Sequence, residues 1–236
     1  RRGVAVTLGG PLYRCRRVFV PGGPTSGMDD DSAIPVTAEP PDSPISVTGT
    51  DHITVMGSNV GDTVAFYRDL LGMPLVLRQP NLDQPEVTHL FFDTGDGRIL
   101  TFFVTEERPS NRQPAMDVGS VHHLAFSIDA EKLQSVKDAL ADAGKRYSEF
   151  DRGAFHSLYT SDNNGLTIEL VVDKYDVPDD RRGEVLALAH GKRVEAGAAY
   201  VDDEHMEAAL DELGIDVARA EVPEAAAGTG VSGNRG

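Results

Sequence analysis

The stretch Asp51-His52-Ile53-Thr54-Val55 is matched further along the chain by His122-His123-Leu124-Ala125-Phe126. Each stretch is followed by a run with a helical spacing of apolar residues, and these runs end at Gly72 and Gly144. Glycine is common just after the C-terminus of a helix because it adopts the left-handed conformation without strain. Each copy then closes on a turn glycine and a run that favours a β-strand. The chain therefore contains an internal duplication, and the duplicated unit decides the fold.

The two copies differ at one chemically important position. Thr101 and Glu169 occupy the same place, four residues past the turn glycine of their copies. The duplicated unit therefore offers a histidine at each start, His52 and His123, but a carboxylate at only one end. Two histidines and one carboxylate suit iron(II), which must keep positions open for oxygen and substrate.

Within each copy, the residue patterns predict a strand, a helix and then three strands. We expect these elements at 51–56, 59–71, 75–79, 88–93 and 99–104 in the first copy, and at 121–128, 130–143, 146–150, 155–160 and 166–172 in the second. The predicted fold class is α/β (α+β), with paired βαβββ modules that form a curved, cup-like mixed sheet. Alternate residues of a strand share a face, so a cup could bring His52, His123 and Glu169 together on its inner surface.

The chain divides into four predicted parts. Residues 1–48 read as a flexible N-terminal segment, in which Met28 could be the natural start. Residues 49–175 form the duplicated domain, with modules 49–105 and 119–175. Residues 176–221 predict a helical extension with amphipathic helices at 181–196 and 203–213, and residues 222–236 predict a disordered tail rich in alanine and glycine.

The charge of the chain is strongly acidic. The formal net charge is -16. From Met28 onward the chain has 17 basic and 38 acidic side chains, which gives a net charge of -21. This field repels nucleic acid and anionic membranes, so we expect neither as a partner. Only five lysines are present. An acidic, lysine-poor surface fits a halophilic protein, because high salt screens its self-repulsion; a merely acidic cytosolic protein is the alternative.

The cysteine count and the hydropathy pattern favour a cytoplasmic protein. Cys15 is the only cysteine of the chain, which excludes an intrachain disulfide framework and a cysteine-based metal site. No apolar run approaches the roughly 18 residues that a membrane span needs.

Three motifs and the repeat together resemble the vicinal oxygen chelate superfamily. The motifs are Asp51-His52 at the first strand, His123 before Leu-Ala-Phe, and the run Asp-Asn-Asn-Gly-Leu-Thr-Ile-Glu-Leu at 162–170. That superfamily includes glyoxalase I, bleomycin and fosfomycin resistance proteins, and extradiol ring-cleaving dioxygenases. The resemblance covers residues 49–175 and implies a metal-dependent enzyme; homodimers are common in the superfamily, so we expect a homodimer.

A narrower resemblance points to the ring-cleaving branch. Asn-Leu-Asp-Gln-Pro at 81–85, His-Leu-Phe-Phe at 89–92 and Ile-Leu-Thr-Phe-Phe at 99–103 look like the branch that contains the chlorohydroquinone 1,2-dioxygenases. Those enzymes are longer and carry additional modules. This resemblance implies Fe(II) or Mn(II) as the metal, and a small aromatic substrate and O2 as the molecules bound.

The resemblance also implies roles for individual residues. The implied metal ligands are His52, His123 and Glu169, and the implied catalytic residues around them are Thr54, His122, Arg152 and Tyr159. One departure concerns the residue before the first ligand. The branch often has a histidine there, and this chain has Asp51, which affects the expected substrate more than the metal.

Each of these residues also has a purely structural interpretation. His52 and His123 could be strand histidines with satisfied hydrogen bonds, and Tyr159 could simply pack. Glu169 lies within an apolar strand, where an unpaired carboxylate would cost several kcal/mol. In a regular strand His122 should point away from His123. The remaining histidines are expected to be structural or exposed: His89, His156, His190 and His205.

Three functions are compatible with the sequence. The first is an extradiol-type dioxygenase that cleaves a catechol or a hydroquinone-like aromatic. The second is a glyoxalase-like lyase, isomerase or thiol transferase, which would use the metal as a Lewis acid without oxygen. The third is a binding module such as a drug-sequestering protein, against which the retained histidines and carboxylate argue.

Overall fold

The structure, a computed structural model, describes residues 34–110 and 117–222. The chain divides into residues 1–35 and a compact unit of residues 36–236, which carries all the elements named below. The predictions for Met28, Cys15, most of the N-terminal segment and the tail after Val222 concern residues outside the described ranges. Among the described residues, no helix is long and apolar enough to cross a membrane.

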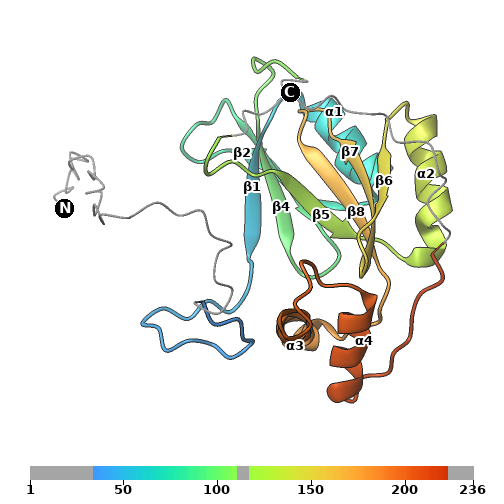
Figure 1. The fold of residues 1–236 in the computed structure, drawn as a ribbon. Helices are drawn as coiled ribbons and strands as arrows, with labels where there is room; N and C mark the ends of the chain where they lie inside the picture. Colours follow the sequence, from blue (N-terminus) through green and yellow to red (C-terminus); the bar gives the residue numbers. More distant parts are fainter. Residues whose placement is uncertain (1–33, 111–116, 223–236) are drawn as a thin grey trace, which may run out of the picture. The chain divides into compact units, whose positions relative to one another are not determined.

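The first module has the predicted order of elements (Figure 1). Its elements are β1 (His52–Gly57), α1 (Val60–Val64), η1 (Ala65–Leu70), β2 (Leu75–Pro80), β3 (Thr88–Asp93) and β4 (Ile99–Val104). η1 continues the helix begun by α1, with π-type hydrogen bonding. The strands form a mixed sheet in the order β1-β4-β3-β2, in which β1 and β4 are parallel.

The second module repeats this arrangement. Its elements are β5 (His123–Ser127), η2 (Ala130–Lys132), α2 (Leu133–Asp142), β6 (Ser148–Asp151), β7 (Phe155–Ser161) and β8 (Thr167–Asp173). The strand order β5-β8-β7-β6 matches that of the first sheet, and β5 is parallel to β8. The predicted βαβββ duplication and the α+β fold class are therefore confirmed, as two mixed sheets of four strands each.

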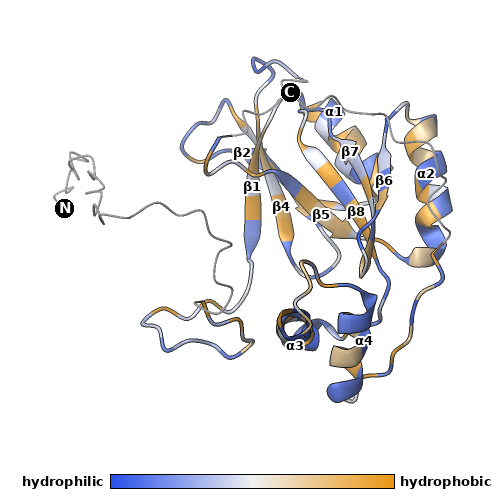
Figure 2. Ribbon diagram, viewed as in Figure 1, coloured by the Kyte–Doolittle hydropathy of each residue, from blue (hydrophilic) through white to orange (hydrophobic). Residues whose placement is uncertain are grey.

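One hydrophobic core is shared by the helix-covered faces of both sheets. Its buried members are Phe66, Tyr67, Met73, Leu90, Phe92, Leu100, Phe102, Val104, Leu133, Leu140, Leu158, Leu166, Ile168, Leu170 and Val172. Strand residues in this set recur at every second position, as expected when one face of a sheet is buried. Figure 2 shows that hydrophobic and hydrophilic residues also alternate along α2.

Because the covered faces meet in this common core, the opposite faces of the two sheets lie on its outside. The opposite face of the first sheet carries His52 and Thr54, and that of the second carries Tyr159 and Glu169. In the part of the chain that the structure describes, β1 and β5 each pair with another strand on one side only. We refer to these two surfaces as the open faces.

The two modules are joined by a buried polar network around Asp162. Its carboxylate accepts hydrogen bonds from the Tyr67 hydroxyl at 2.9 Å and from the backbone N–H groups of Asn164 and Leu166, both at 2.8 Å. The Asn164 side chain in turn accepts a hydrogen bond from the Ser58 N–H at 2.8 Å. The Asp-Asn-Asn-Gly turn of the second module is thereby fixed to the helix start of the first.

A second buried network attaches α2 to its sheet. Glu149 contacts Lys137 at 2.5 Å and His156 at 2.7 Å; the side chains of Glu149 and His156 are buried, and that of Lys137 is partly buried. Burial raises the pKa of Glu149, but the hydrogen bonds from Lys137 and His156 outweigh it, so the pKa is lowered overall. His156 therefore has the structural surroundings that the sequence predicts for it.

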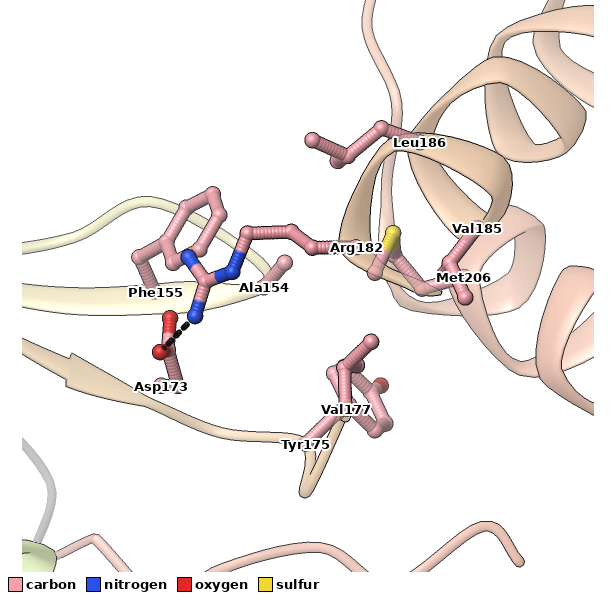
Figure 3. Close-up of a pocket in the computed structure, with 9 residues that line it drawn as sticks. All are labelled: Ala154, Phe155, Asp173, Tyr175, Val177, Arg182, Val185, Leu186 and Met206. Carbon is pink, nitrogen blue, oxygen red and sulfur yellow. Dashed lines mark hydrogen bonds and ion pairs between the residues drawn. The ribbon is translucent and has the colours of Figure 1, made fainter. Parts of the chain in front are cut away.

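The C-terminal extension forms a helical pair. η3 (Asp179–Arg181) leads into α3 (Arg182–Glu195), and α4 (Asp203–Glu212) packs beside it, which confirms the two predicted helices (Figure 1). Figure 3 shows a cavity between this pair, the start of β7 and the end of β8; it is lined by Ala154, Phe155 and Met206 and by the ion pair between Arg182 and Asp173. Its volume is about 20 Å³, room for one water molecule.

Candidate metal centre

A histidine and a glutamate from adjacent strands meet on the open face of the second sheet. His123 begins β5, and Glu169 lies in the middle of β8, opposite Ala125 of β5 and Tyr159 of β7. The His123 Nε2 and Glu169 Oε2 atoms are 2.9 Å apart. Two ligands bound at about 2.1 Å and at right angles would lie about 3.0 Å from each other. The spacing therefore fits two neighbouring ligands of one metal ion.

The second oxygen of Glu169 is held by a tyrosine. Glu169 is only 8 % exposed, so its charge needs partners. The Tyr159 hydroxyl donates a hydrogen bond to Glu169 Oε1 at 2.6 Å. Burial raises the pKa of Tyr159, and the hydrogen bond to Glu169 and its negative charge raise it further. Tyr159 therefore stays protonated at neutral pH and orients Glu169 with Oε2 toward His123.

His122 lies beside His123, whereas within a regular strand it would point away from it. The Nδ1 atoms of the two rings are 2.7 Å apart, and the rings meet edge to face with centroids 5.0 Å apart. The physical reason is that β5 begins at His123, so His122 precedes the strand and does not follow its alternation. One of the two nitrogens must carry the proton of this contact, and His123 Nε2 remains for Glu169 or a metal ion.

His52 has the matching arrangement on the open face of the first sheet. Its Nδ1 contacts Asp51 Oδ1 at 2.6 Å, just as His123 Nδ1 contacts the residue before it. A carboxylate on one ring nitrogen orients a histidine to bind a metal through the other. Asp51, the departure from the ring-cleaving branch, can therefore position His52 Nε2.

One chain does not bring the three implied ligands together. His123 and Glu169 are adjacent, but among residues 34–110 and 117–222 no group of three His, Cys, Asp or Glu side chains could hold a metal ion. His52 lies on the first sheet, whose open face is turned away from the second sheet by the shared core. Within one chain, His52 therefore does not join this pair among the described residues.

Two more predicted site residues lie on the open faces. The Thr54 hydroxyl is 2.7 Å from that of Thr101, which donates the hydrogen bond. This contact fixes Thr54 on the same side of β1 as His52. Arg152 stacks its guanidinium on the Phe150 ring at 4.6 Å, and this ring lies 5.8 Å from that of Tyr159. Arg152 is thus placed near Tyr159.

His89 shares the open face of the first sheet and was given no site role by sequence reasoning. Its ring packs between Phe91 at 4.0 Å and Phe103 at 4.5 Å, and its Nε2 is buried without a hydrogen-bond partner among the described residues. Burial lowers the pKa of His89, and the nearby His52 lowers it further. Strand alternation across β3 and β4 could have placed His89 on this face, because it pairs with Phe103.

Comparison with known proteins agrees with this fold. Residues 49–170 match the family model described as the Glyoxalase/Bleomycin resistance protein/Dioxygenase superfamily. Over 128 residues the chain is 27% identical to MhqE of Bacillus subtilis (strain 168), whose name assigns it provisionally to the ring-cleaving dioxygenases; the match covers 53% of this chain and 41% of MhqE. MhqO of the same organism carries the same kind of name and is 26% identical over 126 residues, with 52% and 39% covered.

Several solved structures align with part of this chain. A structure from Bacillus subtilis, provisionally named as a dioxygenase, aligns with a TM-score of 0.48 and 25% identity, covering 54% of this chain and 41% of that one. The fosfomycin resistance protein FosX from Listeria monocytogenes, solved with Mn(II) and sulfate, aligns with a TM-score of 0.43 and 17% identity over 54% and 93% of the two chains. This chain spans about two fifths of the length of the curated relatives that it matches. The family model covers more than half of the chain, which therefore belongs to the Glyoxalase/Bleomycin resistance protein/Dioxygenase superfamily.

Proposed function

We propose that this protein is a metal-dependent, extradiol-type ring-cleaving dioxygenase that acts on a catechol or a hydroquinone-like aromatic with O2. The observation that carries the proposal is the His123–Glu169 pair, spaced as two neighbouring metal ligands and held by Tyr159. The names of the Bacillus subtilis relatives support the reaction class.

The metal would be held by His52, His123 and Glu169, with Fe(II) as the first candidate and Mn(II) as the second. Imidazole and carboxylate donors suit both metals, and three ligands leave positions free. When bound, the metal would bring the aromatic diol and O2 together at those free positions.

We further infer that a homodimer completes the site, with the partner subunit's His52 joining His123 and Glu169. A two-fold dimer is self-complementary, so each open face of the first sheet would meet the second sheet of the other chain. β1 and β5 offer free edges for this, and Ile53, Met56 and Val121 are exposed on or beside them at 40%, 57% and 52%. Exposed strand edges with apolar residues are suited to association.

The remaining site residues would bind the substrate and move its protons. Tyr159, whose hydroxyl proton is donated to Glu169, would accept a hydrogen bond from a substrate hydroxyl through its oxygen. His122 lies within reach of the same space and could accept a proton from the aromatic hydroxyl. Arg152 would stabilise the resulting anion, and Thr54 would line the opposite wall from the first sheet.

Metal content and oxygen uptake, measured on one anaerobically purified sample in molar salt, test this function. We expect about one iron or manganese per chain, and oxygen consumption that depends on added hydroquinone or catechol. Bound metal without oxygen uptake on a wide panel of aromatic diols would contradict the dioxygenase and favour the lyase, isomerase or thiol transferase alternative. A protein that takes up no metal would contradict both and favour a binding module.

A further inference from the structure

The hairpin turn between β6 and β7 carries Arg152 on one side and, on the other, an ion pair between Asp151 and a buried lysine. On the open face, the Arg152 guanidinium lies over Phe150, next to Tyr159. On the opposite side, the Lys174 Nζ donates to Asp151 Oδ1 at 2.6 Å. The Lys174 side chain is only 6% exposed, whereas that of Asp151 is 59% exposed. A buried ammonium group without a partner costs free energy. The ion pair with Lys174 therefore holds the Asp151 side chain in one position.

Asp151 transmits this constraint to the turn. The oxygen that contacts Lys174 also accepts a hydrogen bond from the Gly153 N–H at 2.9 Å. The backbone N–H of Lys174 donates to the Ala154 carbonyl at 3.0 Å, and the Arg152 N–H donates to the Phe155 carbonyl at 2.8 Å. Lys174 therefore contacts the turn on both sides of Arg152: its side chain binds Asp151, and its backbone N–H binds Ala154.

The C-terminal extension packs against the turn and hydrogen-bonds to Lys174. Ala154 is buried in a second hydrophobic cluster with Val185 of α3 and Met206 of α4, and Figure 3 shows it facing these helices. The Lys174 carbonyl accepts a hydrogen bond from the Ala220 N–H at 2.8 Å. The extension thus packs against the turn that carries Arg152, on the side away from the metal ligands.

We propose that Lys174 is a positioning residue, which together with the helical extension sets the place of Arg152 and so the affinity of the site for an ionised substrate oxygen. This inference rests on the proposed function, because it takes Arg152 to contact the substrate anion. It assigns the extension a role in substrate binding, through the hairpin turn and without any contact to the substrate itself.

Binding of 4-nitrocatechol, whose nitro group makes a ring hydroxyl acidic, tests this role without any turnover. The Kd is measured anaerobically from the absorption change, on full-length protein loaded with Mn(II). We expect R152A to raise the Kd about tenfold, the loss of one charge-assisted contact, and K174M to raise it roughly three- to tenfold. The double variant should bind no more weakly than R152A alone, because Lys174 acts through Arg152. K174R, which keeps the charge, should recover part of the loss.

K192M is the matched control, because Lys192 pairs with Glu212 inside the same helical extension and does not touch the turn. Its Kd should stay at the wild-type value. If K174M does not fold, D151N removes the same ion pair at a more exposed side chain. An unchanged Kd in K174M or D151N would overturn the proposal. So would a double variant, K174M with R152A, whose rise in Kd equals the product of the rises in the two single variants. Wild-type protein that binds the probe but never consumes oxygen would refute the dioxygenase reaction alone.

Discussion

Replacing Glu169 by glutamine is expected to lower metal affinity at least about a hundredfold and to abolish oxygen uptake with hydroquinone or catechol. Loss of a group that merely orients a ligand already costs 10- to 100-fold in affinity, and loss of the ligand itself should cost more. Glutamine keeps the size of the side chain and can still accept the hydrogen bond from Tyr159. Titration of the metal-free protein with Mn(II) measures the affinity, and an oxygen electrode measures the activity.

The matched control is Asp173→Asn, which neutralises a carboxylate four residues further along the same strand. Asp173 contacts Arg182 and faces the cavity beneath the helical extension. Its Mn(II) affinity should equal that of the wild type. Equal metal binding by the Glu169 variant and the wild type would show that the His123–Glu169 pair is a structural contact and not a metal site.

Replacing Asp162 by alanine is expected to lower the free energy of unfolding by about 3–5 kcal/mol. The carboxylate is 2% exposed and satisfies the Tyr67 hydroxyl and two backbone N–H groups, all of which would lose their partner at once. Because this network joins the two modules, the loss should affect the whole fold. Urea unfolding at a fixed chain concentration measures it, since association would contribute to stability.

Tyr67→Phe is the control for Asp162, because it removes one of these hydrogen bonds and leaves the carboxylate with its backbone donors. We expect a loss of about 1 kcal/mol. Burial raises the pKa of Tyr67 and the Asp162 carboxylate raises it further, so the hydroxyl is a donor at all pH values of interest. If Asp162→Ala were no more destabilising than Tyr67→Phe, the network would not hold the modules together.

The duplicated architecture could be predicted because its signals are local. Helical spacing before Gly72 and Gly144 and the alternation in the strands reported the elements to within a few residues. The motif at 162–170 was similarly visible as a family signature. Its structural use, with Asp162 accepting the Tyr67 hydroxyl across the module boundary, is a contact between distant parts of the chain and has no local pattern.

The candidate site was only partly predictable for the same reason. The ligand types followed from the repeat, and the structure places His123, Glu169 and Tyr159 together. The side on which His122 lies depends on the first residue of β5, which the sequence does not fix, and a shift of one residue changes the face. The separation of His52 from the pair depends on how the two sheets pack, which periodicity within each module does not report.

Mixing two inactive variants tests whether the metal site is shared between the two chains of a dimer. H52A lacks one metal ligand and E169Q lacks another. In a dimer with shared sites, a mixed pair therefore has one site with all three ligands and one site that lacks two of them. After random exchange of chains, half of the dimers are mixed, and about a quarter of the wild-type sites should return. If the sites are shared, Mn(II) binding and oxygen uptake should both recover to about that fraction. Wild-type protein that binds Mn(II), with no recovery in a mixture shown to contain mixed dimers, would contradict a shared site.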